Sequence, residues 1–161
     1  MTKKKSEDLF PESDILSENS DSAPGQKISI SGILPGQIIR SMIKSGEVWS
    51  QGSITEEQIQ PASLDLRLSD IAYRIRASFL PSEGSVKEKL TELALHKIDI
   101  SDGAVLETGC VYLVPLMEAL SLPERITAIS NPKSSTGRVD VFTRLICAGS
   151  HEFDKVPGGY K

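Results

Sequence analysis

Two segments of the chain repeat apolar residues at helical spacing. Pro35 opens the first segment and Gly46 closes it. Because proline suits the first turn of a helix and glycine suits the position after its end, the sequence predicts a short amphipathic helix here. Its apolar face consists of Ile38, Ile39, Met42 and Ile43. A second amphipathic helix is predicted from the spacing of Val86, Leu90, Leu93 and Ala94.

Residues 62–68 alternate strictly between apolar and polar side chains. Leu64, Leu66 and Leu68 share one face, and Asp65 and Arg67 share the other. This period of two predicts a half-buried strand with the leucines on its apolar face. Asp65 and Arg67 either orient each other or a ligand, or form a solvated ion pair that contributes less than about 1 kcal/mol.

Further short apolar runs, at 110–116, 139–142 and 145–147, also predict strands. Turn-forming residues separate these runs, and residues 151–161 are predicted to form a loop. Many short strands with two minor helices favour a mostly-β fold, a distorted β-barrel or jelly roll.

Residues 1–27 form a Ser-rich segment with many acidic residues and few apolar ones. Ordering such a segment costs more conformational entropy than its burial returns, so we predict a disordered tail. A peptide that docks on a partner is the alternative. The folded domain is expected to span residues 28–161.

The composition argues against several classes of binding partner for this protein. A formal net charge of −4 argues against broad binding to nucleic acid or to a membrane surface. No apolar run approaches the roughly 20 residues of a membrane-spanning helix. Two cysteines and no secretory signal favour reduced thiols in a cytoplasmic protein. The chain has two cysteines and two histidines, and it lacks the His-x-Glu and Pro-Cys-x-x-Cys pattern of zinc deaminases. We therefore expect no bound zinc.

The residues from Lys133 to Arg138 combine two cations, three hydroxyls and a glycine. Lys133 supplies a point charge, and Arg138 a planar fork that matches phosphate oxygens. Gly137 lets backbone N–H groups approach a ligand closely. The hydroxyl donors are Ser134, Ser135 and Thr136. The cluster therefore predicts a phosphate-binding segment, although a polar surface turn after Pro132 has the same composition.

Four stretches together resemble the dCTP deaminase family, relatives of the trimeric dUTPases. The first is Pro-Ala-Ser-Leu-Asp-Leu-Arg-Leu at 61–68, and the second is Leu-Glu-Thr-Gly at 106–109 with Tyr-Leu-Val-Pro at 112–115. The third is Ser-Leu-Pro-Glu at 121–124. The fourth, at 133–138, is similar to the family's Gly-Arg/Lys-Ser-Ser-x-x-Arg phosphate motif. The predicted first helix also fits, so the resemblance covers about residues 33–161.

The resemblance implies a distorted, dUTPase-like (β-clip) fold assembled as a homotrimer. It implies hydrolytic deamination of dCTP to dUTP and ammonia, with Mg²⁺ bound through the triphosphate and without zinc. Lys133, Ser134, Ser135, Thr136, Gly137 and Arg138 would then form the triphosphate site. Asp154 resembles the family aspartate that contacts the nucleoside, or it is simply a turn-forming aspartate.

The chain departs from the family pattern at several positions. Pro132 stands where glycine is usual, and two extra residues separate Asp154 from Pro157. The catalytic glutamate of the family is expected beyond Lys161, and Glu152 is not assigned that role. We therefore expect the domain to continue past Lys161. The competing hypotheses are a dUTP pyrophosphatase of the same superfamily and a catalytically incomplete nucleotide-binding or trimer-forming segment.

Overall fold

The first helix forms where the sequence predicts it. The computed structural model describes residues 31–80 and 85–161, and within it helix α1 spans Gly36–Ser45. Gly46 ends the helix with a φ of 80°, a left-handed conformation that costs glycine little, and its N–H lies against the carbonyls of Ile43 and Met42. The predictions for residues 1–27, and for a domain start at residue 28, lie outside the described residues.

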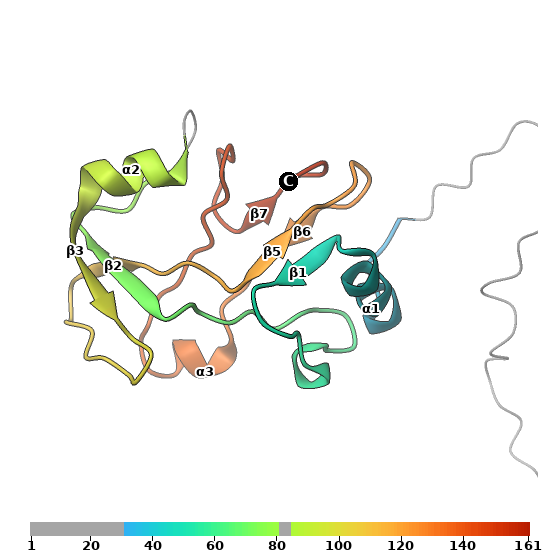
Figure 1. The fold of residues 1–161 in the computed structure, drawn as a ribbon, viewed down its shortest axis with the longest axis horizontal. Helices are drawn as coiled ribbons and strands as arrows, with labels where there is room; N and C mark the ends of the chain where they lie inside the picture. The colour runs from blue at the N-terminus through green and yellow to red at the C-terminus, as the bar shows by residue number, and fades with distance from the viewer. Residues whose placement is uncertain (1–30, 81–84) are drawn as a thin grey trace, which may run out of the picture. The chain divides into compact units, whose positions relative to one another are not determined.

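Residues from Ile33 to Lys161 form one unit with three small antiparallel sheets (Figure 1). β1 (Val48–Ser50) pairs with β5 (Glu118–Leu120). β2 (Ile71–Ile75) lies between β3 (Ala94–Asp99) and β4 (Val111–Leu113). β6 (Ala128–Ile129) pairs with β7 (Lys155–Val156). The remaining elements are the 3₁₀ turn η1 (Glu56–Gln58) and the helices α2 (Val86–Leu93) and α3 (Ser134–Gly137).

A small core joins elements that are far apart in the sequence. Its buried members are Met42, Val48, Leu122, Cys147 and Val156. They come from α1, β1, the segment before β6, the segment after α3, and β7 respectively. The N–H of Leu122 donates to the carbonyl of Tyr160 at 2.8 Å. Tyr160 of the C-terminal turn packs against this core, and β7, which precedes the turn, pairs with β6.

Residues 62–68 do not form the predicted continuous strand. They take part in isolated bridges only, Ile59 with Leu64 and Leu68 with Leu116. Leu66 and Leu68 are 39% and 60% exposed, whereas Asp65 and Arg67 are half-buried. Leu66 and Leu68 thus depart from the hydrophobic expectation, and Arg67 turns toward the buried carboxylate of Glu118, whereas Leu64 packs against the core as predicted.

Other boundaries also differ from the predictions. Residues 139–142 and 145–147 form no strand, and Val139 and Phe142 are largely exposed. Ala94 leaves the helix for extended backbone, since α2 ends at Leu93 and β3 pairs with β2. β1, β5 and β7 are strands of two or three residues that the sequence analysis missed. In the described part of the chain, no helix combines the length and apolar character needed to cross a membrane.

Candidate functional site

The predicted phosphate-binding segment, Lys133–Arg138, forms a short helical turn at the surface (Figure 1). It follows β6, and Lys133 has extended backbone immediately before α3. The Lys133 carbonyl accepts from the N–H groups of Thr136 and Gly137, and the N–H of Arg138 donates to the Ser134 carbonyl. The turn is therefore closed by its own backbone, which gives the predicted donors a defined order along one exposed element.

Most of the donors in this segment are uncommitted. Ser134, Ser135 and Arg138 are exposed, and Thr136 is half-buried. Within residues 31–80 and 85–161, none of these four side chains forms a side-chain hydrogen bond or an ion pair. Lys133 is the one residue of the segment whose side chain does, within those ranges. Four side chains with free donors on one turn are able to bind an anion with several oxygens, such as a phosphate chain.

Gly137 is not required by the packing of this chain. A Cβ at this position would meet no atom within 4 Å. The open space beside Gly137 is compatible with the close approach of a ligand that the sequence predicts, but the fold alone does not demand glycine there.

Lys133 contacts Asp65, a residue 68 positions earlier. Its Nζ donates to Oδ2 of Asp65 at 2.6 Å. The Asp65 side chain is 27% exposed and that of Lys133 is 64% exposed. The structure thus brings the predicted phosphate segment against the Asp-Leu-Arg segment, whose polar residues the sequence analysis had singled out.

Asp65 is itself held by glutamine side chains. Gln60 donates to the Asp65 carboxylate at 3.3 Å, and the amide of Gln58 donates to its carbonyl at 2.9 Å. The N–H of Asp65 donates in turn to the carbonyl of Gln58 at 2.8 Å. Because three contacts fix its backbone and carboxylate, Asp65 is a defined partner for Lys133.

Glu118 is the centre of a buried polar network that includes Gln58 and Arg67. Its side chain is 1% exposed and accepts from the N–H of Arg67 at 2.7 Å and from its Nε at 2.8 Å. The same Gln58 amide that holds Asp65 also donates to Glu118 at 3.0 Å. Desolvation acts to raise the pKa of Glu118, but the hydrogen bonds from Arg67 and Gln58 outweigh it and hold this pKa below its ordinary value. The carboxylate is therefore charged and fully paired.

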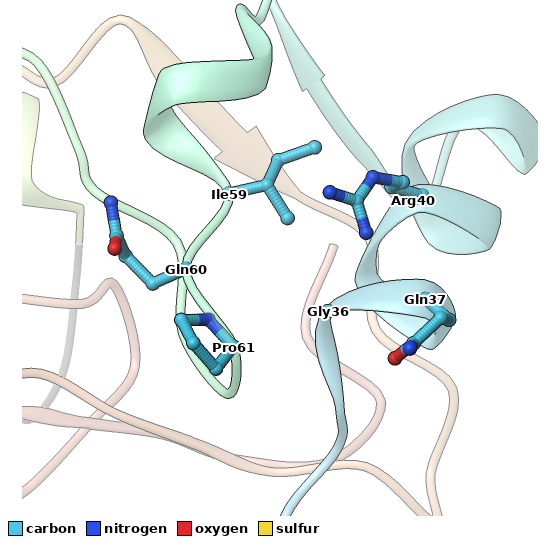
Figure 2. Close-up of a pocket in the computed structure, with 6 residues that line it drawn as sticks. All are labelled: Gly36, Gln37, Arg40, Ile59, Gln60 and Pro61. Carbon is cyan, nitrogen blue, oxygen red and sulfur yellow. The ribbon is translucent and has the colours of Figure 1, made fainter. Parts of the chain in front are cut away.

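A pocket of about 280 Å³ lies beside the same region (Figure 2). Gln37 and Arg40 of α1 face Ile59, Gln60 and Pro61 across it, and Gly36 completes the lining. A Cβ at Gly36 would lie 2.8 Å from the carbonyl oxygen of Gln60, so this close approach requires glycine. Arg40 is already paired with Glu56 at 2.9 Å. The pocket contains no residue of the phosphate-binding segment.

Asp154 lies in a turn next to the start of the phosphate-binding segment. It has a left-handed φ of 65°, and its carbonyl accepts from the N–H of Ser130, the residue after β6, at 2.8 Å. Its carboxylate accepts from Arg144 and from the N–H of Leu145, each at 2.7 Å. The aspartate therefore organises its own turn, and its contact with a nucleoside stays a prediction. Glu152 pairs with Lys155 on the surface, and within the described residues it contacts neither Asp154's partners nor the phosphate-binding segment through its side chain.

The sequence analysis missed Gln58 and Glu118. Gln58 lies in the 3₁₀ turn η1, where the sequence analysis predicted no element, and Glu118 lies between apolar residues in a three-residue strand. One signal could have been read, because a lone carboxylate inside an apolar run has to find a partner once it is buried. Within the described residues, no three His, Cys, Asp or Glu side chains gather in a group able to hold a metal ion.

Comparisons with known proteins give one family for this chain and a solved structure with a similar fold. The family model of the 2'-deoxycytidine 5'-triphosphate deaminase N-terminal domain matches residues 30–161. A solved structure of 2'-deoxycytidine 5'-triphosphate deaminase from Agrobacterium tumefaciens is 54% identical and has a TM-score of 0.77. That match covers 80% of this chain and 39% of the other. It confirms the predicted fold class, a mostly-β, distorted, dUTPase-like fold.

A curated relative gives the same indication at lower identity. It is a protein of Hydrogenobaculum sp. (strain Y04AAS1) named "dCTP deaminase, dUMP-forming" and is 30% identical over 111 residues. The aligned region covers 68% of this chain and 58% of that protein. This chain thus corresponds to little more than half of the curated relative and to less than half of the Agrobacterium chain.

Proposed function

Because this chain belongs to the 2'-deoxycytidine 5'-triphosphate deaminase family, we propose that the protein hydrolyses dCTP to dUTP and ammonia. The observation that carries this proposal is the exposed turn Lys133–Arg138, where the uncommitted donors of the family's phosphate motif lie side by side. The 54% identity to the Agrobacterium deaminase supports the choice of substrate. In the cytoplasm, where we place the protein, this reaction supplies dUTP for pyrimidine deoxynucleotide synthesis.

In this proposal, Lys133 and Arg138 neutralise the triphosphate. Ser134, Ser135 and Thr136 donate to its oxygens, and Gly137 leaves room for the phosphate chain. Mg²⁺ reaches the site bound to phosphate oxygens, which are ligands it favours, and no cage of protein carboxylates is needed. Asp154 contacts the nucleoside from the turn beside β6.

Deamination also requires a general base. A carboxylate takes a proton from the attacking water and transfers it to the departing amine. The family resemblance assigns this role to a glutamate, and none of the residues of the proposed triphosphate site supplies it. The role of the described residues is accordingly to bind and orient the triphosphate, and the carboxylate acts at the other end of the nucleotide.

A pyrophosphatase activity is the second candidate, and the name of the Hydrogenobaculum relative gives a specific reason to test it. A dUMP-forming enzyme releases a diphosphate in addition to ammonia, whereas we propose dUTP as the product here. The protein purified from its native source should convert dCTP to dUTP and should leave added dUTP intact. Formation of dUMP and pyrophosphate from dUTP, with dCTP left unchanged, would replace the proposal with the pyrophosphatase alternative. Formation of dUMP, pyrophosphate and ammonia from dCTP would replace dUTP as the proposed product with dUMP.

We propose a homotrimer as the working assembly. Several large apolar side chains remain uncovered in the single chain, among them Leu68 at 60%, Ile129 at 74% and Phe142 at 82% exposure. The family resemblance implies this assembly, and exposed apolar side chains mark contacts between subunits where they form a contiguous patch. Light scattering after size-exclusion chromatography should give three times the 17.5 kDa mass of the 161-residue chain. A monomer at every concentration from micromolar to millimolar would contradict the trimer.

A further inference from the structure

We propose that Asp65 is a positioning residue that anchors the phosphate-binding segment through Lys133. This inference rests on the proposed triphosphate site and adds a residue to it. The pair joins two parts of the chain that are 68 residues apart, and its N–O distance of 2.6 Å is short for an ammonium–carboxylate contact.

The carboxylate side of the pair is built into the fold. Asp65 is tied through Gln58 to Glu118, and Glu118 is tied to Arg67. As whole residues, Gln58 and Glu118 are 7% and 8% exposed, so this chain of contacts runs from the buried network to the surface pair. Asp65 also accepts from Gln60. Gln58 thus holds the backbone of Asp65, and Gln60 at 3.3 Å holds its carboxylate, so the side chain loses less rotational freedom when it fixes a partner.

The lysine side of the pair determines where the turn begins. The carbonyl of Lys133 accepts the N–H groups of Thr136 at 3.0 Å and Gly137 at 3.4 Å. Fixing Lys133 therefore fixes the first turn of α3, which carries the hydroxyl donors. An ammonium has three N–H donors, so Lys133 can keep one on Asp65 and offer the other two to phosphate oxygens.

The contrary hypothesis is that Asp65 competes with phosphate for Lys133. In that case, removal of the carboxylate charge would free the lysine and tighten nucleotide binding. If Asp65 is an anchor, removal of its charge should instead weaken nucleotide binding, because the freed lysine and turn would have to be ordered again when the nucleotide binds. The sign of the change in affinity therefore separates the two hypotheses.

Calorimetric titration of dCTP and of dCMP tests the anchor. We expect Asp65→Asn to weaken dCTP binding roughly fivefold, a loss in the range of an exposed ion pair, and to change dCMP binding much less. Lys133→Met should weaken dCTP binding more strongly, and Asp65→Asn added to it should cause no further loss. Asp65→Glu should restore part of the affinity. Glu92→Gln is the matched control, since it removes the same charge from an exposed pair on α2.

Hydrogen exchange provides a second readout that needs no nucleotide. Asp65→Asn should speed amide exchange in the peptide that contains residues 134–138, and Glu92→Gln should not. Unchanged exchange, unchanged or tighter dCTP binding, or additive losses in the double variant would each overturn the inference. If the unaltered chain binds no dCTP at all, both the proposed triphosphate site and the anchor are contradicted. If it binds dCTP and Asp65→Asn has no effect, only the anchor fails.

Discussion

Replacing Glu118 with alanine is expected to lower the free energy of unfolding by about 3 kcal/mol, near the lower end of the range for breaking a buried ion pair. The carboxylate is 1% exposed and pairs with Arg67, whose side chain keeps 34% of its surface exposed. Because water still reaches the abandoned guanidinium, the loss should stay below the upper end of that range. Urea unfolding followed by circular dichroism measures it.

An exposed ion pair provides the control for this variant. Glu56→Ala breaks the pair between Glu56 and Arg40, whose side chains are 74% and 41% exposed respectively, and should lower the free energy of unfolding far less than Glu118→Ala does. Equal losses for Glu118→Ala and Glu56→Ala would show that the buried network does not stabilise the fold as described.

The same network has a defined pH dependence. A carboxyl group whose pKa is lower in the folded than in the unfolded chain stabilises the fold above its unfolded pKa and loses this contribution as the pH falls through the folded value. The pKa of Glu118 is lowered from 4.5. The stability difference between the unaltered chain and Glu118→Gln should therefore be fully present above that pH and shrink below it.

Replacing Arg138 with alanine is expected to weaken dCTP binding by about 1.5–3 kcal/mol, or roughly ten- to a hundredfold. Arg138 is exposed, and among the ion pairs of the described residues none includes it. The substitution should therefore leave the free energy of unfolding within about 0.5 kcal/mol of its original value. Calorimetric titration with dCTP and urea unfolding measure the two effects separately.

Arg76→Ala is the matched control for Arg138→Ala. Arg76 is also an exposed arginine, but it follows β2 and lies outside the phosphate-binding segment. Its loss removes the same charge and should change dCTP affinity only slightly. If Arg138→Ala binds dCTP as tightly as the unaltered chain, Arg138 does not belong to the site.

Local patterns were sufficient to predict helices α1 and α2 and the polar segment Lys133–Arg138, although not the helical form of that segment, α3. The apolar spacing between Pro35 and Gly46 is a short-range signal, and α1 forms there with Gly46 at its end. The cations and hydroxyls of Lys133–Arg138 are likewise contiguous, so their chemistry could be read before their structure was known. Their assignment to a triphosphate rests on the family resemblance and remains to be tested.

Long-range contacts decided what the sequence could not predict. Alternation at 62–68 suggested buried leucines, but Arg67 turns toward Glu118, 51 residues away, and Leu66 and Leu68 are exposed, so that only Leu64 packs against the core. The two- and three-residue strands carry too few side chains to show a period. The Lys133–Asp65 contact depends on how two surface turns meet, which no local pattern specifies.

The most direct test of the proposed function follows the amino nitrogen and the phosphates of dCTP together. The protein from its native source is incubated with Mg²⁺ and with dCTP labelled with ¹⁵N at the amino group. The ¹⁵N and ³¹P signals are then followed by NMR. The account predicts that ¹⁵N-ammonium appears in equal amount to dUTP, with the three phosphorus signals of a triphosphate retained. Retention of the label on the base, or release of pyrophosphate in step with ammonium, would contradict it.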